Sequence, residues 1–236
     1  MLKTVLRGVT RPVARVLYRP TVTGRENVPR QGPVLFASNH LSFIDSVVIT
    51  LIAPRDVRFL AKSEYFTGTG AKGRVSKGFF ESIGAIPVDR ESNTAAQDSL
   101  ERGREVLEAG GAFAIYPEGT RSRDGRLYKG RTGVAWLALT TGSPIVPVAL
   151  TGTEELLPVD AKVPRIRPVT IRFGEPIDPT SYGEAGAARS RRRLTDDVML
   201  AIGEMSGQER ANAYNEPPAA SVVERVRRVL HRNDPS

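Results

Sequence analysis

Apolar and polar positions alternate in a pattern that divides the chain into short strands and longer helices. Seven apolar runs separated by turn-forming residues predict strands. They are Val22–Gly24, Val34–Ser38, Val57–Ala61, Ala85–Val88, Ala112–Tyr116, Ile145–Ala149 and Val169–Phe173. Four helices are predicted at Ile44–Ile52, Thr94–Ala109, Thr132–Thr141 and Ser190–Met205. Because strands and helices alternate, we expect a single α/β domain with a mainly parallel sheet flanked by helices, and sites where strands end.

The first twenty residues predict a separate amphipathic helix. Its apolar residues fall on one side of a helical wheel, and they are Leu2, Val5, Leu6, Val9, Val13, Val16 and Leu17. The opposite side is basic, and no acidic residue precedes Glu26. This pattern is typical of a helix lying in an anionic membrane interface, with a kink or break at Pro12. A helix packed on the domain with solvated arginines is the alternative.

The C-terminal region differs from the domain in composition. Residues 207–219 are rich in Asn, Pro and Ala and predict a linker. Residues 221–232, "SVVERVRRVLHR", predict a short basic amphipathic helix, which could dock on the domain, contact a membrane or fray. We therefore expect a membrane-interface helix over 1–20, a domain over 21–206, and a linker with a basic helix over 207–236.

Composition narrows the classes of function. The chain has 236 residues, a formal charge of +8, two histidines and no cysteine. The absence of cysteine excludes disulfides, thiolate nucleophiles and zinc ribbons, and with two histidines we expect no metal centre. The basic charge favours anionic partners such as phosphates or acidic membranes, whereas 6% aromatic residues speak against a base-stacking nucleic-acid platform. No apolar run approaches the roughly 20 residues of a membrane span, and no signal-peptide core is seen, so we expect an intracellular protein.

One of the two histidines lies in a turn between a predicted strand and a predicted helix. The stretch "NHLSFID" places His40 five positions before Asp45. Ser42 and Asp45 fit a capping box, in which the aspartate only satisfies backbone donors. The same spacing lets the carboxylate orient the imidazole as a general base. No Gly-x-Ser-x-Gly elbow is present, so such a base would activate a hydroxyl of a substrate.

Two further strand-end loops carry charge. In "AIYPEGTRSRDG" the turn after the strand holds Glu118, Gly119, Thr120 and Arg121. The glycine permits close approach of the backbone to a ligand, and the arginine fork suits phosphate. "GAIPVDR" ends another strand at Arg90. Each loop alone is compatible with a solvated surface turn, but three such loops together favour a site for a phosphorylated substrate.

With these motifs the sequence resembles the glycerolipid acyltransferases, which include the 1-acylglycerol-3-phosphate O-acyltransferases. "NHLSFID" matches their His-x4-Asp motif, and "GAIPVDR" resembles their second block. "YPEGTRS" resembles their Phe-Pro-Glu-Gly-Thr-Arg-Ser block with tyrosine in place of phenylalanine, and "IVPVAL" resembles their fourth. The four blocks keep the family's order and spacing across roughly residues 22–175.

The resemblance implies an activity and roles for individual residues. A fatty acyl group would pass from acyl-CoA or acyl-carrier protein to the free hydroxyl of 1-acylglycerol 3-phosphate, giving phosphatidic acid without further cofactor. His40 would be the general base and Asp45 its orienting partner. The residues implied to bind the substrate are Asn39, Lys62, Arg90, Glu118, Gly119, Thr120 and Arg121. The protein would work as a peripheral enzyme at the cytoplasmic face of a membrane.

Other functions remain as alternatives. The acceptor could be glycerol 3-phosphate or another lysophospholipid, or the protein could be a non-enzymatic module that binds anionic lipid. "GTGAKG" at 68–73 matches a dinucleotide fingerprint, but that fingerprint requires a strand directly before the first glycine and an apolar helix after it. Polar residues on both sides predict a flexible loop instead, with Lys72, Arg74 and Lys77 available to an anionic donor or headgroup.

Overall fold

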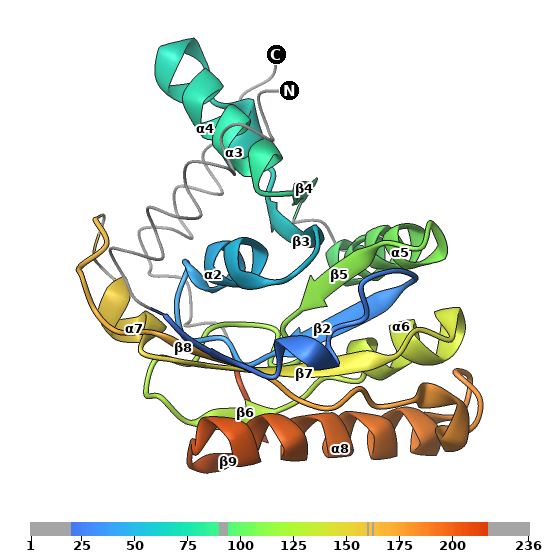
Figure 1. Ribbon diagram of the computed structural model, residues 1–236. Coiled ribbons are helices and arrows are strands. Elements are labelled where there is room, and N and C mark those ends of the chain that lie inside the picture. The colour runs from blue at the N-terminus through green and yellow to red at the C-terminus, as the bar shows by residue number, and fades with distance from the viewer. Residues whose placement is uncertain (1–19, 90–93, 160, 162, 217–236) are drawn as a thin grey trace.

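The computed structural model describes residues 20–89, 94–159, 161 and 163–216 and shows an α/β fold built on one seven-stranded sheet (Figure 1). The strand order is β1-β8-β7-β2-β5-β3-β4, and every neighbouring pair is parallel except β7 and β8. The strands are β1 Thr21–Thr23, β2 Val34–Ser38, β3 Val57–Lys62, β4 Ala85–Val88, β5 Ala112–Ile115, β7 Ile145–Thr151 and β8 Thr170–Phe173. All seven predicted strands are therefore confirmed as members of one mainly parallel sheet.

The central strand β2 shows why the sheet is covered on both faces. All five of its residues are buried, as expected for a parallel strand with helices above and below. Val34 and Phe36 pack in one core, and Leu35 and Ala37 pack in the other, because successive side chains point to opposite faces. Figure 1 shows α2 on the first face and α8 on the second.

The predicted helices form with ends shifted by at most two residues. They are α2 Asp45–Ile52, α5 Ala95–Glu108, α6 Gly133–Thr141 and α8 Ala188–Ser206. Shorter elements that the pattern did not predict are η1 Arg25–Asn27, α3 Glu64–Thr67, α7 Thr153–Leu156 and η2 Pro179–Tyr182. No helix in the described part of the chain is long and apolar enough to cross a membrane.

The predicted flexible loop at 68–73 is wrong, because most of it belongs to helix α4, Gly70–Ser82. Gly73 of this helix packs so closely on the preceding turn that a Cβ atom there would lie 1.8 Å from the carbonyl oxygen of Gly68. The element before the first glycine is the helix α3 and not a strand. The requirement of the dinucleotide fingerprint is therefore not met.

The predicted linker is also wrong in part. Residues Arg210–Tyr214 form strand β9, which pairs with the unpredicted strand β6, Leu127–Lys129. The folded domain thus extends past residue 206 to include β9. The predicted N-terminal helix over 1–20, apart from its last residue, and the predicted C-terminal helix over 221–232 lie outside the described residues.

Candidate active site

His40 lies in the turn between the end of β2 and the start of α2. Its Nδ1 atom is 2.8 Å from Oδ2 of Asp45, the first residue of α2. The imidazole is 15% exposed, whereas the Asp45 side chain is completely buried. This hydrogen bond assigns the Nδ1 proton to the side of the carboxylate. The second ring nitrogen, Nε2, makes no hydrogen bond to a described residue and is left to exchange a proton with a ligand.

Asp45 also supports the backbone of the turn. Oδ2 accepts hydrogen bonds from the amides of Leu41 at 2.7 Å and Ser42 at 2.9 Å. The helix begins at Asp45 with Ile44 as its N-cap, so Ser42 lies before the helix and the predicted capping box is wrong. The Ser42 hydroxyl instead donates to the carbonyl oxygen of Leu157 at 2.6 Å. One oxygen atom of Asp45 therefore holds both the imidazole of His40 and the backbone of the turn before α2.

Tyr116 stacks on the imidazole and was not singled out from the sequence. The ring centroids of His40 and Tyr116 are 3.8 Å apart, with an angle of 11° between the planes. The Tyr116 hydroxyl lies 2.7 Å from the hydroxyl of Ser46 on α2. Two contacts thus hold the histidine: the carboxylate in the plane of the ring and the tyrosine on its face. The one sequence signal was the replacement of phenylalanine by tyrosine in "YPEGTRS".

The buried side chain of Glu118 holds the backbone of the His40 turn in place. It is fully buried, and its two carboxylate oxygens accept hydrogen bonds from the amides of His40 and Tyr128, each at 3.0 Å. Burial raises the pKa of Glu118 to about 7, although these two hydrogen bonds act in the opposite direction. The side chain therefore positions the backbone of His40. The predicted contact of Glu118 with a substrate stays a prediction.

Asn39 is likewise part of the framework. Its amide nitrogen donates to the carbonyl oxygen of Leu150 at 2.9 Å and to Gln208 Oε1 at 2.7 Å, and its oxygen accepts from the Leu150 amide at 2.8 Å. Both amide protons are used, so no donor is left for a substrate. Asn39 ties the ends of β2 and β7 together, and its predicted substrate contact stays a prediction.

The turn that follows Glu118 carries the cationic side chain of Arg121. Gly119 has a φ of 80°, and a Cβ atom there would lie 2.9 Å from Nε of Arg131. Arg121 is half-buried and makes no hydrogen bond or ion pair to a described residue. The next amide in the chain, that of Ser122, donates to the carbonyl oxygen of His40 at 2.8 Å. The Arg121 backbone is therefore held beside the histidine, with its guanidinium uncommitted.

The remaining predicted site residues are less closely tied to His40. Lys62 is exposed at the end of β3 and pairs in register with Val88 of β4. The carboxyl ends of parallel strands share one edge of the sheet, so Lys62 lies at the same edge as His40. The backbone oxygen of Thr120 accepts from Nδ2 of Asn215 at 3.3 Å. Arg90 lies outside the described residues.

Gln208 and Asn215, on either side of β9, and Arg131 make contacts that the sequence analysis missed. Gln208 contacts Asn39, and its amide donates to the carbonyl oxygen of Gly125 at 2.7 Å. Arg131 donates to the carbonyl oxygen of Asn215 at 3.2 Å. These contacts join positions up to 169 residues apart in the chain, so local patterns gave no signal for them. Together they hold the 119–125 turn against the domain.

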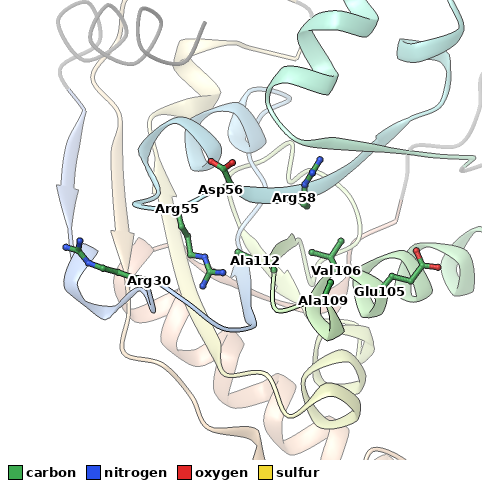
Figure 2. Close-up of a pocket in the computed structure, with 9 residues that line it drawn as sticks. Arg30, Arg55, Asp56, Arg58, Glu105, Val106, Ala109 and Ala112 are labelled. Carbon is green, nitrogen blue, oxygen red and sulfur yellow. The ribbon is translucent and has the colours of Figure 1, made fainter. Parts of the chain in front are cut away.

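A cavity of about 560 Å³ lies at the opposite edge of the sheet, at the amino ends of β3 and β5 (Figure 2). Figure 2 shows the side chains of Arg30 and Arg58 pointing outward from it. The guanidinium of Arg55 donates to two backbone carbonyl oxygens at 2.9 and 3.2 Å, so it serves to join loops. Neither His40 nor Asp45 lines this cavity. Within the described residues, no group of three or more His, Cys, Asp or Glu side chains is placed to hold a metal ion.

A mainly parallel sheet with a His–Asp pair at its carboxyl edge is the arrangement expected of an acyltransferase. Comparison with known families confirms this class. The family model described as Acyltransferase matches residues 19–151, more than half of the chain. The chain belongs to the acyltransferase family.

Several curated relatives are named for one particular acyltransferase reaction. A chloroplastic 1-acyl-sn-glycerol-3-phosphate acyltransferase of Brassica napus is 32% identical over 147 residues, which cover 61% of this chain and 41% of the relative. A protein of the same name from Chlamydomonas reinhardtii is 30% identical over 184 residues, covering 77% of this chain and 53% of the relative. The chain thus spans about half, or less, of the length of these relatives.

A solved structure shares the fold. The 1-acyl-sn-glycerophosphate acyltransferase PlsC of Thermotoga maritima matches with a TM-score of 0.62, over 84% of this chain and 80% of that one. The sequence identity is 23%, so the likeness is one of architecture.

Proposed function

We propose that the protein transfers a fatty acyl group from a thioester donor to the free hydroxyl of 1-acylglycerol 3-phosphate, giving phosphatidic acid. The observation that carries this proposal is the 2.8 Å contact between His40 and a fully buried Asp45, at the sheet edge where Arg121 is uncommitted. Membership of the acyltransferase family and the names of the relatives support the choice of reaction.

The proposed reaction mechanism uses Nε2 of His40, the ring nitrogen that does not face Asp45. Nε2 of His40 takes the proton of the acceptor hydroxyl as that oxygen attacks the carbonyl carbon of the thioester. The positive charge that develops on the imidazole is stabilised by the Asp45 carboxylate and by the face of Tyr116. When the tetrahedral intermediate collapses, the carbon–sulfur bond breaks and the imidazolium returns its proton to the leaving thiolate. No covalent enzyme intermediate is required.

The acceptor phosphate is positioned by cationic side chains. The guanidinium of Arg121 offers two parallel donors to phosphate oxygens, which fixes the orientation of the glycerol as well as its position. Lys62, at the end of β3, and Arg90 are proposed as further phosphate contacts. Glu118 and Asn39 hold the backbone of this site, and Gly119 and Thr120 shape the turn.

The proposal also names the acyl donor, the location of the protein and the alternative acceptors. Both acyl-CoA and acyl-carrier protein are anionic and suit the basic chain as donors. We propose peripheral attachment to an anionic membrane at its cytoplasmic face. Acylation of glycerol 3-phosphate or of another lysophospholipid is the second candidate, because Arg121 would bind either phosphate. A lipid-binding module without activity would not need the His40–Asp45 geometry.

The test is a turnover assay with three acceptors. Purified full-length protein is incubated with palmitoyl-CoA and either lysophosphatidate, glycerol 3-phosphate or lysophosphatidylcholine. Free thiol is followed by absorbance, and lipid products are identified by mass spectrometry. We expect thiol release and phosphatidic acid with lysophosphatidate. Release with glycerol 3-phosphate alone would reassign the acceptor, and no release with any of them would leave the lipid-binding module.

A further inference from the structure

Helix α4 presents an apolar stripe to solvent. Ala71, Val75 and Phe79 are spaced four residues apart and therefore share one side of the helix. Val75 is 73% exposed and Phe79 is 43% exposed. The buried side of the same helix is formed by Gly73 and Phe80. Figure 1 shows α4 projecting away from the body of the domain. Phe79 makes an edge-on contact with Phe80 of the same helix, but Val75 and much of the Phe79 side chain remain exposed.

Basic residues flank this stripe. Lys72, Arg74 and Lys77 are all exposed on α4. Lys77 forms an ion pair with Glu81 at 3.9 Å, whereas Lys72 and Arg74 form none with a described residue. An exposed apolar stripe bordered by unpaired cations is typical of helices that lie in the interface of an anionic bilayer.

A second exposed segment has the same character. Val159, Val163 and Ile166 are 40%, 74% and 66% exposed. They lie between α7 and β8, and the exposed Arg165 and Arg167 alternate with them. We call these five described residues, Val159, Val163, Arg165, Ile166 and Arg167, the 159–167 loop; residues 160 and 162 lie outside the described part of the chain. A loop of this kind places apolar side chains below the headgroups and arginines among them.

Both surfaces are joined to the turn that carries His40. Phe43 contacts Tyr65 of α3 and Phe80 on the buried side of α4, with centroid distances of 5.6 Å and 6.2 Å. On the other side, the Ser42 hydroxyl donates to the carbonyl oxygen of Leu157, two residues before the 159–167 loop. In Figure 1 α4 and this loop rise on the α2 side of the sheet, and α8 covers the opposite side. The histidine turn therefore lies between the two exposed apolar patches.

We propose that the α4 stripe and the 159–167 loop together form the surface that docks on an anionic lipid bilayer. Docking there sets the His40 turn against the membrane, so that a lysophospholipid enters from the bilayer without crossing water. The surface is distinct from the first twenty residues, on which the attachment predicted from sequence depends. This inference rests on the proposed function only for the identity of the lipid that enters.

The direct test is vesicle binding by a variant in which each patch gains a charge. Val75→Glu combined with Ile166→Glu is compared with Leu200→Glu, because Leu200 is 45% exposed on α8, on the opposite side of the sheet. Full-length proteins are sedimented with phosphatidylcholine vesicles containing phosphatidylglycerol. We expect the double variant to partition at least about tenfold less than wild type and the control to stay within about twofold.

Turnover separates this inference from the proposed function. With a short-chain lysophosphatidate dissolved as monomers, the double variant is expected to match wild type, because its substitutions lie outside the site. With long-chain lysophosphatidate in vesicles, it is expected to lose about tenfold. Wild-type protein that binds vesicles as described but acylates neither substrate would overturn the function and leave the surface standing.

Two results would overturn the surface. One is unchanged vesicle binding by the double variant while wild type acylates lysophosphatidate. The other is a wild-type dimer in sedimentation without lipid that becomes monomeric in the double variant, since the patches would then join two copies of this chain. Circular dichroism of each variant checks that the fold is retained. Lys72→Gln with Arg165→Gln serves as a second variant, which keeps the apolar side chains and is expected to lose binding mainly to anionic vesicles.

Discussion

Replacing Asp45 by asparagine separates the charge of this side chain from its structural role. The oxygen of asparagine can occupy the position of Oδ2 and accept the same bonds from the Leu41 and Ser42 amides and from His40. Its amide would then take the place of Oδ1, which has no hydrogen-bond partner among the described residues. The turn is therefore retained, and the negative charge beside the imidazole is lost.

The size of the effect follows from Coulomb's law. With the charge centres about 4 Å apart and an effective dielectric constant of about 20, the carboxylate stabilises a developing imidazolium by about 4 kcal/mol. That free energy corresponds to about a thousandfold in rate. We therefore expect Asp45→Asn to lower kcat about a thousandfold, with little change in the KM of the acceptor.

The assay is thiol release with saturating palmitoyl-CoA and lysophosphatidate, together with thermal unfolding of the same samples. Asp45→Ala is the structural comparison, because it also removes the acceptor of two buried amides and should cost about 1–3 kcal/mol of stability for each. If Asp45→Asn kept kcat within about threefold of wild type while folding normally, the charge would not act on the reaction and the reasoning would fail.

Three further predictions concern the neighbours of the histidine. Arg121→Ala should raise the KM for lysophosphatidate about tenfold or more with a smaller change in kcat; steady-state kinetics check this, and an unchanged KM would contradict the phosphate contact. Tyr116→Phe keeps the ring stack and should lose about 1 kcal/mol of unfolding free energy, with kcat nearly retained. Tyr116→Ala removes the stack and should lower kcat about tenfold. Equal kcat values for these two variants would exclude a role of the stack in the reaction. Because the pKa of Glu118 is raised to about 7 by burial, the folded state holds a proton that the unfolded state has released between about pH 4.5 and 7. Stability should therefore fall by about 3 kcal/mol as pH rises through that window. Urea unfolding at pH 5 and 8 should show this loss in wild type and not in Glu118→Gln, and equal losses would contradict it.

The sheet was predictable because its strands are uninterrupted apolar runs. The strand "VLFAS" is buried at all five positions, which matches its nearly continuous apolar sequence. The helix α4 was not, because its sequence holds three glycines and its few apolar residues are separated by basic and polar ones. It forms because Gly73 lets it pack on the backbone of Gly68 and because Phe80 enters the core. Strand β9 has a polar sequence, and only its pairing with β6 makes it a strand.

The site was predictable where partners are close in sequence. The contact of His40 with Asp45 spans five positions, and a strand-to-helix turn brings such positions together. Contacts between distant positions could not be predicted from the sequence. Asn39 is committed to Leu150, 111 positions away, and Glu118 to the amide of His40, 78 positions away. Motif position alone does not distinguish a side chain that faces a substrate from one that holds the backbone behind it.

The most direct measurement compares the two histidines of the chain in the thiol-release assay. His40→Ala and His231→Ala are each incubated with palmitoyl-CoA and lysophosphatidate beside the wild-type protein. If His40 removes the proton from the acceptor hydroxyl, its replacement abolishes release to the background rate, while the variant at position 231 retains wild-type turnover. Appreciable phosphatidic acid from correctly folded His40→Ala would contradict the account.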